Sequence, residues 1–228
     1  MTLAAVLFDM DGTLVDSEKL WDIALRDLAE HLGGVLSAAG RAAIVGTSAG
    51  QTMAIFRADL GRPDLDPDEG NAFLSARMTE LYAAGIPWRP GAEELVDAVR
   101  AAGVRTALVT NTGRTLVDVA LRTLDASRFH AVICGDEVAR TKPHPDPYLA
   151  AAAALGVAPS RCIAIEDSPT GLASARGAGC AVIAIPNDLP LSDDDIAGVT
   201  VRSSLLDVDL GLLRDLVATA PASPPAPA

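Results

Sequence analysis

Acidic, hydroxyl and basic side chains recur in a fixed order along this chain, each following an apolar run or lying in the loop beyond one. In sequence order they are Asp9 and Asp11, Thr110 and Asn111, Lys142, and Glu166 and Asp167. An ionised carboxylate can attack phosphorus as a nucleophile, and further carboxylates supply the oxygen ligands that Mg²⁺ prefers. A hydroxyl, backbone N–H groups at the start of a helix and a lysine can hold phosphate oxygens. Together these groups favour phosphoryl transfer.

The first pair of acids ends the stretch around which the chain is organised. Residues 4–8 form an apolar run with β-branched and aromatic members, short enough for a strand that is buried on both faces. Asp9 and Asp11 follow, and Gly12 then breaks the pattern. Open α/β sheets bind ligands outside the carboxyl ends of their strands, so we expect both acids at such an edge. Taken alone, the pattern also fits a strand followed by an ordinary Asp-Gly turn.

Strand-like and helix-like stretches alternate along most of the remaining chain. The predicted strands cover residues 104–109, 131–134, 162–165, 180–185 and 199–201. The predicted helices cover 92–102, 115–124, 147–155 and 205–218, and a further helix follows the segment 166–171 and ends at 178. This alternation predicts an α/β fold with a doubly wound parallel sheet, a Rossmann-like core covered on both faces. Because the carboxyl ends of parallel strands lie along one edge, side chains distant in sequence can converge there.

The segment between the first two strands has a different character, because it contains helical patterns and no convincing strand. Its predicted helices cover residues 16–33, 38–45, 51–60 and 67–84. We interpret residues 16–87 as an inserted α-helical cap domain, with residues 1–15 and 88–218 forming the core. Residues 219–228, rich in Pro, Ala and Ser, are expected to be a disordered tail.

Composition limits the class of partner. The formal net charge of −12 argues against nucleic acid and anionic membranes. No apolar run reaches the roughly 18 residues of a membrane span, and the N-terminus lacks a secretory pattern. The cysteines, Cys134, Cys162 and Cys180, fall in apolar runs without metal-ligand spacing, so we interpret them as reduced core residues. We therefore expect a cytoplasmic monomer that acts on a small phosphorylated metabolite.

Each polar group also has an ordinary structural explanation when it is taken alone. Thr110 and Asn111 fit a helix cap, residues 166–167 fit a turn, and Lys142 fits a solvated loop. If each group had only its ordinary structural role, their occurrence together, in this order and at strand ends, would be a coincidence that is hard to explain.

Four motifs carry a resemblance to a known family. Residues 9–13 (DMDGT), 110–111 (TN), 142–143 (KP) and 166–171 (EDSPTG) resemble the motifs of the haloacid dehalogenase-like hydrolase superfamily. The first and last motifs are specific, whereas the middle two are weak alone but correctly ordered. The helical insert resembles the cap of the subfamily that includes β-phosphoglucomutase and phosphoglycolate phosphatase. The resemblance covers nearly the whole chain apart from the tail.

The resemblance implies a role for each motif residue. Asp9 is expected to be the nucleophile, and Asp11 the general acid and then the general base. Thr110 and Lys142 are expected to clamp the phosphate, with Asn111 beside them in the substrate site.

The resemblance also implies that the cofactor is a Mg²⁺ ion bound at this site. Asp9, the backbone carbonyl of Asp11 and Asp167 would bind the metal. Glu166 would be a further ligand, either direct or through water.

The two acids of the first motif must differ in protonation. One must be ionised to attack phosphorus, while the other must deliver a proton to the leaving oxygen. Mg²⁺ and Lys142 would favour ionised Asp9, and Asp11 would hold a proton when the cap excludes water. Water would later attack the aspartyl-phosphate with Asp11 acting as base.

Three other classes of protein deserve comparison. Receiver domains also use an acidic cluster, Thr, Lys and a phosphorylated Asp, but they are about half this length and lack a helical insert. A dehalogenase would use Asp9 but has no need of a proton donor at Asp11 or of acids at Glu166 and Asp167. An inactive binding module would not require a competent residue at every motif position, as this chain has.

Within phosphoryl transfer, the alternative to a phosphatase is a sugar phosphomutase of the β-phosphoglucomutase type. That mutase resembles this chain but carries His and Arg where Trp21 and Ala49 stand here. Neither side chain accepts a proton or bears charge, so we expect net hydrolysis of a sugar or polyol phosphate, with Arg26, Arg57 or Arg77 as the substitutes that a mutase would need. The cap candidates for substrate contact, chosen by position only, are Thr47, Ser48, Lys19, Trp21, Gln51 and Met53.

Overall fold

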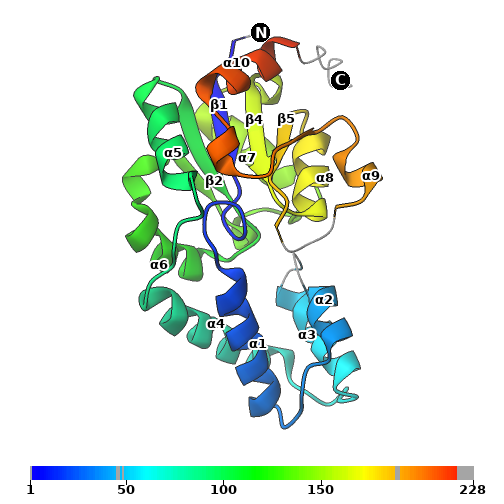
Figure 1. The fold of residues 1–228 in the computed structure, drawn as a ribbon. Helices are drawn as coiled ribbons and strands as arrows, with labels where there is room; N and C mark the ends of the chain where they lie inside the picture. Colours follow the sequence, from blue (N-terminus) through cyan, green and yellow to red (C-terminus); the bar gives the residue numbers. More distant parts are fainter. Residues whose placement is uncertain (1, 45–46, 48, 188–190, 220–228) are drawn as a thin grey trace.

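The computed structural model describes residues 2–44, 47, 49–187 and 191–219. Its centre is a six-stranded sheet in the order β3-β2-β1-β4-β5-β6 (Figure 1), and every neighbouring pair is parallel. The strands are β1 (Ala5–Phe8), β2 (Arg105–Val109), β3 (Ala131–Ile133), β4 (Cys162–Glu166), β5 (Ala181–Ala184) and β6 (Thr200–Val201). Such an order reverses direction next to the first strand, where doubly wound sheets bind ligands. The predicted α/β fold with a doubly wound parallel sheet is confirmed.

Alternate residues of the central strands face two separate layers of helices. Val6 and Phe8 of β1 pack with the helices on one face, whereas Ala5 and Leu7 face the other layer, and all four are fully buried. The first layer contains α5 (Ala92–Ala101), α6 (Arg114–Leu124) and α10 (Leu210–Thr219), and the second contains α7 (Asp146–Leu155) and α8 (Pro169–Gly177). Burial on both faces explains why the strands are continuous apolar runs and show no polar alternation.

The register of the sheet places the functional strand ends level with one another. Phe8, the last residue of β1, pairs with Leu108 of β2 and with Ile165 of β4. The segments that follow these strands therefore leave the sheet side by side, which is the physical basis of the site.

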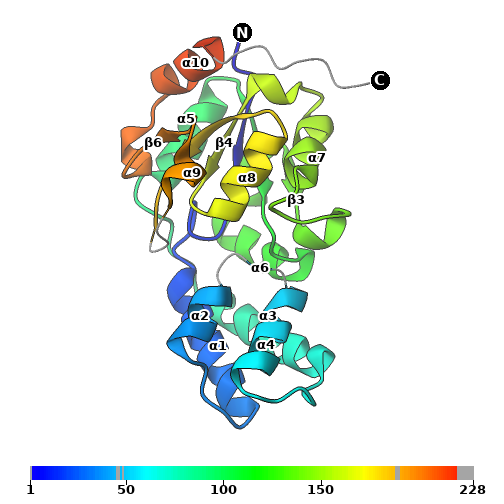
Figure 2. The ribbon, with the colours of Figure 1, turned by 90° about the vertical axis from the view of Figure 1, so that its right-hand side faces the viewer.

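Of the described helices between β1 and β2, all but α5 lie together beyond the carboxyl edge of the sheet, as Figures 1 and 2 show. They are α1 (Glu18–His31), α2 (Ala38–Ile44), α3 (Ala49–Asp59) and α4 (Pro67–Ala83). They share an apolar interior that includes Leu28, Phe56 and Met78. We call these four helices the cap. Its domain boundaries, residues 16 and 87, stay a prediction.

The two connections between the sheet and the cap lie beside each other. The amide of Asp16 donates to the carbonyl of Pro87 (3.0 Å), and the amide of Arg89 donates to the carbonyl of Leu14 (2.8 Å). Helix α4 also packs against both α1 and α6, so the cap contacts the core at a second place.

The predicted terminal helix over residues 205–218 is wrong in its first part. Residues Leu205–Asp207 form the short 3-10 helix η4, Val208 is extended, and α10 begins only at Leu210. The carboxylate of Asp209 accepts a hydrogen bond from the amide of Leu212 (2.8 Å), so this acid caps a new helix. Thr219, predicted to start the tail, is the last residue of α10, and residues 220–228 lie outside the described part.

Four short elements escaped the sequence prediction. They are α9 (Asp193–Ile196) and the 3-10 helices η1 (Ala126–Arg128), η2 (Gly135–Glu137) and η3 (Pro159–Arg161). Each is too short for a hydrophobic period to develop. In the case of α9, the Ser192 side chain and Asp195 form a reciprocal cap, which was the local signal available.

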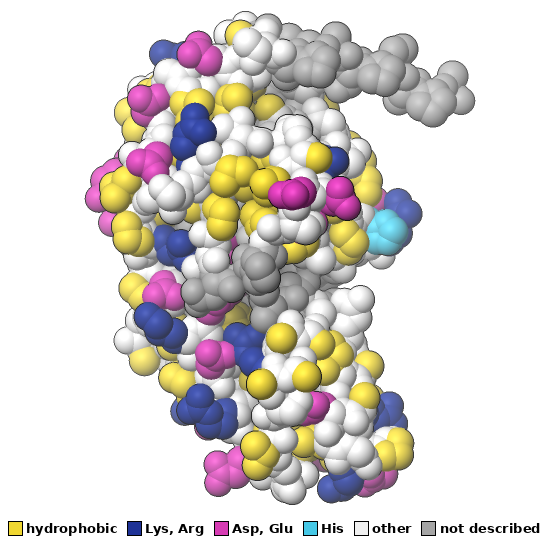
Figure 3. Space-filling view, turned by 45° about the vertical axis from the view of Figure 1, so that its right-hand side comes forward, with side chains coloured by type: hydrophobic (Ala, Val, Ile, Leu, Met, Phe, Trp, Pro, Cys, Tyr) yellow, Lys and Arg dark blue, Asp and Glu magenta, His cyan; other side chains and the backbone are white. Residues whose placement is uncertain are grey.

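Two further features of the molecule are its surface and its cysteines. Among the described residues, no helix has the length and apolar character needed to cross a membrane. On the face drawn in Figure 3, acidic and basic side chains are interspersed over both halves of the molecule. Cys134 and Cys162 are buried and Cys180 is half-buried, each as a free thiol.

Candidate active site

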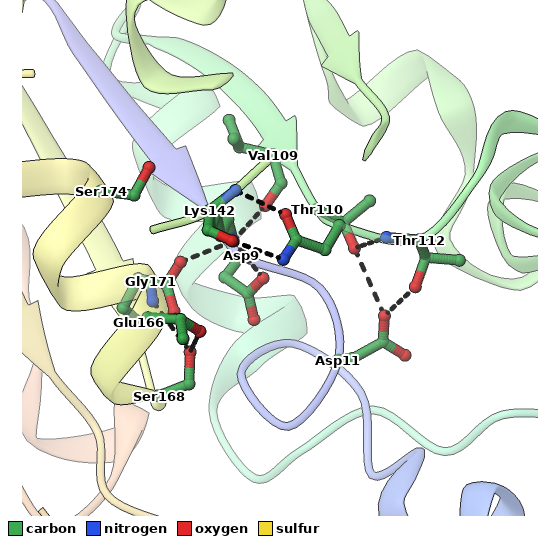
Figure 4. A network of polar contacts seen from close by, with 12 residues as sticks. Asp9, Asp11, Val109, Thr110, Thr112, Lys142, Glu166, Ser168, Gly171 and Ser174 are labelled. Carbon is green, nitrogen blue, oxygen red and sulfur yellow. Dashed lines mark hydrogen bonds and ion pairs between the residues drawn. The ribbon is translucent and has the colours of Figure 1, made fainter. Parts of the chain in front are cut away.

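The centre of the site is the ammonium group of Lys142, which is buried among oxygen atoms (Figure 4). Its Nζ donates to Asp9 Oδ1 (2.6 Å), to Glu166 Oε1 (2.6 Å) and to the carbonyl of Val109 (2.9 Å). These partners come from the ends of three adjacent strands, β1, β4 and β2. The structure thus brings together three of the residues that the sequence predicts to act together.

The charges in this cluster alter one another's proton affinity. The pKa of Asp9 is raised to about 7, first because it is buried and then because Glu166 lies close, while Lys142 opposes both effects. Burial would lower the pKa of Lys142, but the carboxylates of Asp9 and Glu166 outweigh it and raise that pKa above its usual value. The lysine is therefore a permanent cation at neutral pH.

Asp167 completes a set of three buried acids. One oxygen from each of Asp9, Glu166 and Asp167 lies within 4.8 Å of the others. Burial, followed by the charges of Asp9 and Glu166, raises the pKa of Asp167 well above its usual value. Within the described chain, no group donates a hydrogen bond to its carboxylate. A buried carboxylate without a hydrogen-bond donor is stabilised by a proton or by a cation, and an all-oxygen set fits a hard divalent ion such as Mg²⁺.

Two glycines allow the acidic loops to approach one another. Gly12 has a positive φ of 80°, and a Cβ on it would lie 2.0 Å from an Asp167 oxygen. At Gly171, the third residue of α8, a Cβ would lie 1.9 Å from an oxygen of Glu166. The glycines of the first and last motifs therefore make room for the carboxylates, and no larger residue fits without moving them.

The side chain of Asn111 contacts both the amide and the carbonyl of the Lys142 backbone. Its Oδ1 accepts a hydrogen bond from the Lys142 amide (2.9 Å), and its Nδ2 donates to the Lys142 carbonyl (3.3 Å). The side chain therefore holds the lysine loop in place. Asn111 also belongs to the lining of the cavity described below, and its role in substrate binding stays a prediction.

Asp11 points away from the lysine cluster and lies between the core and the cap. On the core side, its Oδ2 accepts hydrogen bonds from the hydroxyl groups of Thr112 (2.7 Å) and Thr110 (3.4 Å). On the cap side, Oδ1 accepts from Ser17 (2.7 Å) and from Tyr82 (2.5 Å). The second acid of the motif is therefore held by donors from both parts of the molecule.

Two tyrosines are functional positions that the sequence reasoning missed. Tyr82 of α4 reaches Asp11, and Tyr148 of α7 donates to Glu166 Oε1 (2.6 Å) with its ring 5.3 Å from the Lys142 nitrogen. Both side chains are buried. Their signal was slight: Tyr82 continues an apolar helix face, and Tyr148 is a polar ring in an alanine-rich helix.

A cavity of about 400 Å³ lies between the cap and the carboxyl edge of the sheet. Its lining includes Asp9, Asp11, Thr110, Lys142 and Asp167 from the predicted site.

The cap candidates chosen by position divide into two groups. Thr47 and Trp21 line the cavity, and the Trp21 Nε1 lies 3.4 Å from Asp11 Oδ1. Met53 is instead buried in the cap interior, and Lys19 is exposed beside Asp16. Gln51 is exposed and is absent from the cavity lining. Ser48 lies outside the described residues.

A model of the haloacid dehalogenase-like hydrolase family matches residues 3–179 of this chain. The chain belongs to this family. The match covers the four predicted motifs and the cap, so the resemblance deduced from the motifs is confirmed.

Several proteins resemble this hydrolase over most of their length. Protein CbbY of Rhodobacter capsulatus is 36% identical over 85% of this chain and 90% of its own. Hexitol phosphatase B of Escherichia coli is 30% identical over 95% of both chains. A variant of CbbY from Rhodobacter sphaeroides, solved with xylulose 1,5-bisphosphate, is 28% identical with a TM-score of 0.82, covering 90% of this chain and 96% of that one.

These likenesses establish the class of reaction. The chain is a hydrolase of the haloacid dehalogenase-like family, and it shares the phosphatase class with relatives such as hexitol phosphatase B. The prediction of a hydrolase acting on phosphate monoesters is confirmed at that level.

The close approach at Gly171 gives a test of the acidic site. Gly171→Ala should lower phosphatase activity on p-nitrophenyl phosphate by roughly 10-fold or more, because the new methyl group displaces the Glu166 carboxylate from Lys142. Gly50→Ala is a suitable control, since a Cβ at Gly50 meets nothing within 4 Å. Equal activity for the two variants would contradict the packing described here.

Proposed function

We propose that this hydrolase is a Mg²⁺-dependent phosphatase that cleaves a small sugar or polyol phosphate by way of a phosphorylated Asp9. The observation that carries the proposal is the division of labour between the two acids of the first motif. Asp9 is fixed by Lys142 at the carboxyl edge, while Asp11, two residues later, is held by separate donors on the same cavity.

The first half of the reaction uses Asp9 as nucleophile. Its Oδ1 is bonded to Lys142, so the other oxygen, Oδ2, attacks phosphorus. The bond between phosphorus and the ester oxygen breaks, and that oxygen takes a proton from Asp11. The products are the free alcohol and a phosphoryl group bound covalently to Asp9.

The second half restores both acids. A water molecule attacks the phosphoryl group and passes its proton to Asp11, and the bond between Asp9 and phosphorus breaks. Inorganic phosphate then leaves, and each acid has the protonation state with which it began.

The set Asp9, Glu166 and Asp167 would hold the Mg²⁺ ion, with the backbone carbonyl of Asp11 as a further ligand. When bound, the ion would offset the negative charge of these acids and of the phosphate. Lys142, with a raised pKa and two carboxylate partners, keeps Asp9 oriented throughout.

Hydrolysis is favoured over transfer between two sugar hydroxyls. A mutase must remove a proton from a sugar hydroxyl held in the cap, where this chain has Trp21. An indole N–H only donates, and this one is directed at Asp11. The names of the hexitol phosphatase and of the CbbY complex with xylulose bisphosphate support a small sugar phosphate as the substrate class.

Replacement of the nucleophile tests the covalent route. Asp9→Asn should reduce turnover of a panel of sugar and polyol phosphates by more than about 100-fold, because an amide cannot form the acyl phosphate. Release of inorganic phosphate is the measurement, with mass spectrometry to exclude deamidation. Retention of more than about a hundredth of the activity would exclude Asp9 as nucleophile.

Metal binding should depend on pH in a particular direction. The pKa values of Asp9, about 7, and Asp167 are raised by folding, so protonation of these acids stabilises the folded protein at low pH. That contribution disappears as the pH rises through about 7, where Mg²⁺ replaces the protons. Saturating Mg²⁺ should raise the Tm by roughly 5–10 °C at about pH 8 and by much less at about pH 5.

The control for the metal experiment is Asp167→Asn. This variant should lose most of the Mg²⁺-dependent increase in Tm, because one charged ligand is gone. An increase that is the same in both proteins, or the same at both pH values, would contradict the assigned site.

The contact between Tyr82 and Asp11 should matter most when the leaving group needs a proton. Tyr82→Phe removes one donor to Asp11 Oδ1 without removing the ring. We expect roughly 10-fold lower kcat with sugar phosphates, a smaller loss with p-nitrophenyl phosphate, and a displaced pH profile of kcat. Equal losses on the two substrates with an unchanged profile would assign Tyr82 a purely structural role.

A further inference from the structure

One face of helix α4 lines the cavity but takes no part in the reaction described above. Its lining residues recur at intervals of three or four positions, as on one side of a helix: Asn71, Leu74, Ser75 and Met78. Thr47, just before α3, and Thr52, in the first turn of α3, line the same cavity. This part of the cap wall therefore combines apolar side chains with uncharged polar ones.

Helices α3 and α4 meet beside this face. A Cβ on Gly70 would collide with the terminal methyl group of Met53, so the two helices touch at these positions. Asn71 follows Gly70 and Thr52 precedes Met53, and both side chains line the cavity. They therefore reach the cavity from the two helices that make this contact. We call Asn71, Thr52 and Thr47 the polar corner of the cap.

The side-chain oxygen of Asn71 has no partner within the described chain. Its Oδ1 is buried, and no hydrogen bond joins it to a described residue. Arg41, the basic side chain that the cap contributes to the described lining, is by contrast paired with Asp22. A buried amide oxygen without a donor lowers folding stability, so the presence of Asn71 at this position calls for an explanation other than stability.

The direction of the hydrogen bond between the two threonines follows from a count of their protons. Thr47 donates its only hydroxyl proton to the carbonyl of Ile44 (2.7 Å). Its oxygen lies 3.0 Å from the Thr52 hydroxyl oxygen, so Thr52 is the donor within this pair. Thr52 then has no further proton to give to a ligand, and its oxygen can only accept. The polar corner is therefore rich in acceptors, with Asn71 Oδ1 as the buried one.

This arrangement selects the kind of group that can fill the corner. A hydroxyl group can donate to Asn71 Oδ1 and can accept from Asn71 Nδ2. An ionised phosphate or carboxylate has no proton to donate, and an apolar group would leave the buried oxygen unpaired. The polar corner thus suits a hydroxyl group and disfavours both of the other classes.

We propose that Asn71, assisted by Thr52, is a specificity-determining residue that binds a hydroxyl group of the leaving alcohol, away from the ester oxygen. The inference rests on the proposed function, since it places the phosphate at Asp9. Asp9 and the polar corner line one cavity of about 400 Å³, so a single ligand can contact both. A site built to bind a hydroxyl group discriminates strongly against an analogue that lacks it, because the buried acceptor then stays unpaired.

Binding to the Asp9→Asn protein separates recognition from turnover. With Mg²⁺ present, calorimetry compares ribitol 5-phosphate and sorbitol 6-phosphate with the monodeoxy analogues of each. In at least one of these series, removal of one particular hydroxyl group should weaken binding by at least about 10-fold, because Asn71 Oδ1 loses its donor. Losses below about 10-fold at every position in both series would overturn the proposal.

Substitution of Asn71 in that background identifies the residue responsible. In Asn71→Leu and in Asn71→Ala, the parent polyol phosphate and the sensitive deoxy analogue should bind within about 3-fold of each other, because the partner of the hydroxyl group is gone. Thr79→Val is the control and should leave the difference unchanged, since Thr79 lies on the same helix outside the cavity lining. A difference that persists in both Asn71 variants would overturn the assignment.

Thermal unfolding distinguishes a binding residue from a structural one. Asn71→Ala removes a buried acceptor without a partner and improves the helix propensity of α4. The Tm of the protein without ligand should therefore rise by roughly 2–4 °C. A Tm that falls instead would assign Asn71 a structural role and overturn the proposal.

The remaining outcomes distinguish this inference from the proposed function. Hydrolysis of p-nitrophenyl phosphate by the native enzyme, without binding of either polyol phosphate to the Asp9→Asn protein, would overturn the role of Asn71 and leave the phosphatase activity established. Failure of the native enzyme to release phosphate from any ester, p-nitrophenyl phosphate included, would overturn the proposed function, and the binding comparison would still decide the role of Asn71.

Discussion

The structure depends on one buried ammonium group. Lys142 offsets the negative charge of two carboxylates whose burial would otherwise destabilise the folded protein. Removing one member of such a group costs about 3–5 kcal/mol of folding stability, because the remaining charges stay buried without a partner. Several features outside the charged cluster serve this contact. The Asn111 side chain is hydrogen-bonded to both the amide and the carbonyl of Lys142. Tyr148 donates to Glu166 Oε1, the same oxygen that Lys142 contacts. The register of β1 and β4 places Asp9 and Glu166 level with each other.

The second constraint is that Asp11 is held by hydrogen-bond donors from both the core and the cap side of the molecule. The core supplies Thr110 and Thr112 to one oxygen, and the cap supplies Ser17 and Tyr82 to the other. A group that exchanges protons must lie within hydrogen-bond reach of its partner, about 2.6–3.2 Å between heavy atoms, so the geometry of Asp11 depends on the contact between α4 and the core. The cap therefore does more than cover the site, because it supplies two of the donors that orient Asp11.

Sequence reasoning located the sheet and the motif residues for a physical reason. Parallel strands are apolar throughout and end abruptly, so Asp9 and Glu166 could be placed from residue types alone. Tyr82, Tyr148 and Arg41 could not be placed, because their contacts join elements that are far apart in the chain. The contact between the Asn111 side chain and the Lys142 backbone was not foreseen for the same reason, because the two residues are 31 positions apart in the chain. Near the C-terminus, hydrophobic spacing predicted one helix over residues 205–218. Asp209 instead caps a new helix that begins at Leu210, so the predicted helix is divided at this acid.

Charge then explains why the two walls of the cavity differ. The core wall carries three buried acids and one lysine, which leaves an excess of negative charge where a phosphate anion must approach. A divalent cation held by Asp9, Glu166 and Asp167 would offset that excess mainly close to these acids, since an electrostatic field weakens with distance and with exposure to water. The rest of the cavity belongs to a chain whose formal net charge is −12. On the opposite wall, Arg41, which is paired with Asp22, is the basic side chain that the cap contributes to the described lining.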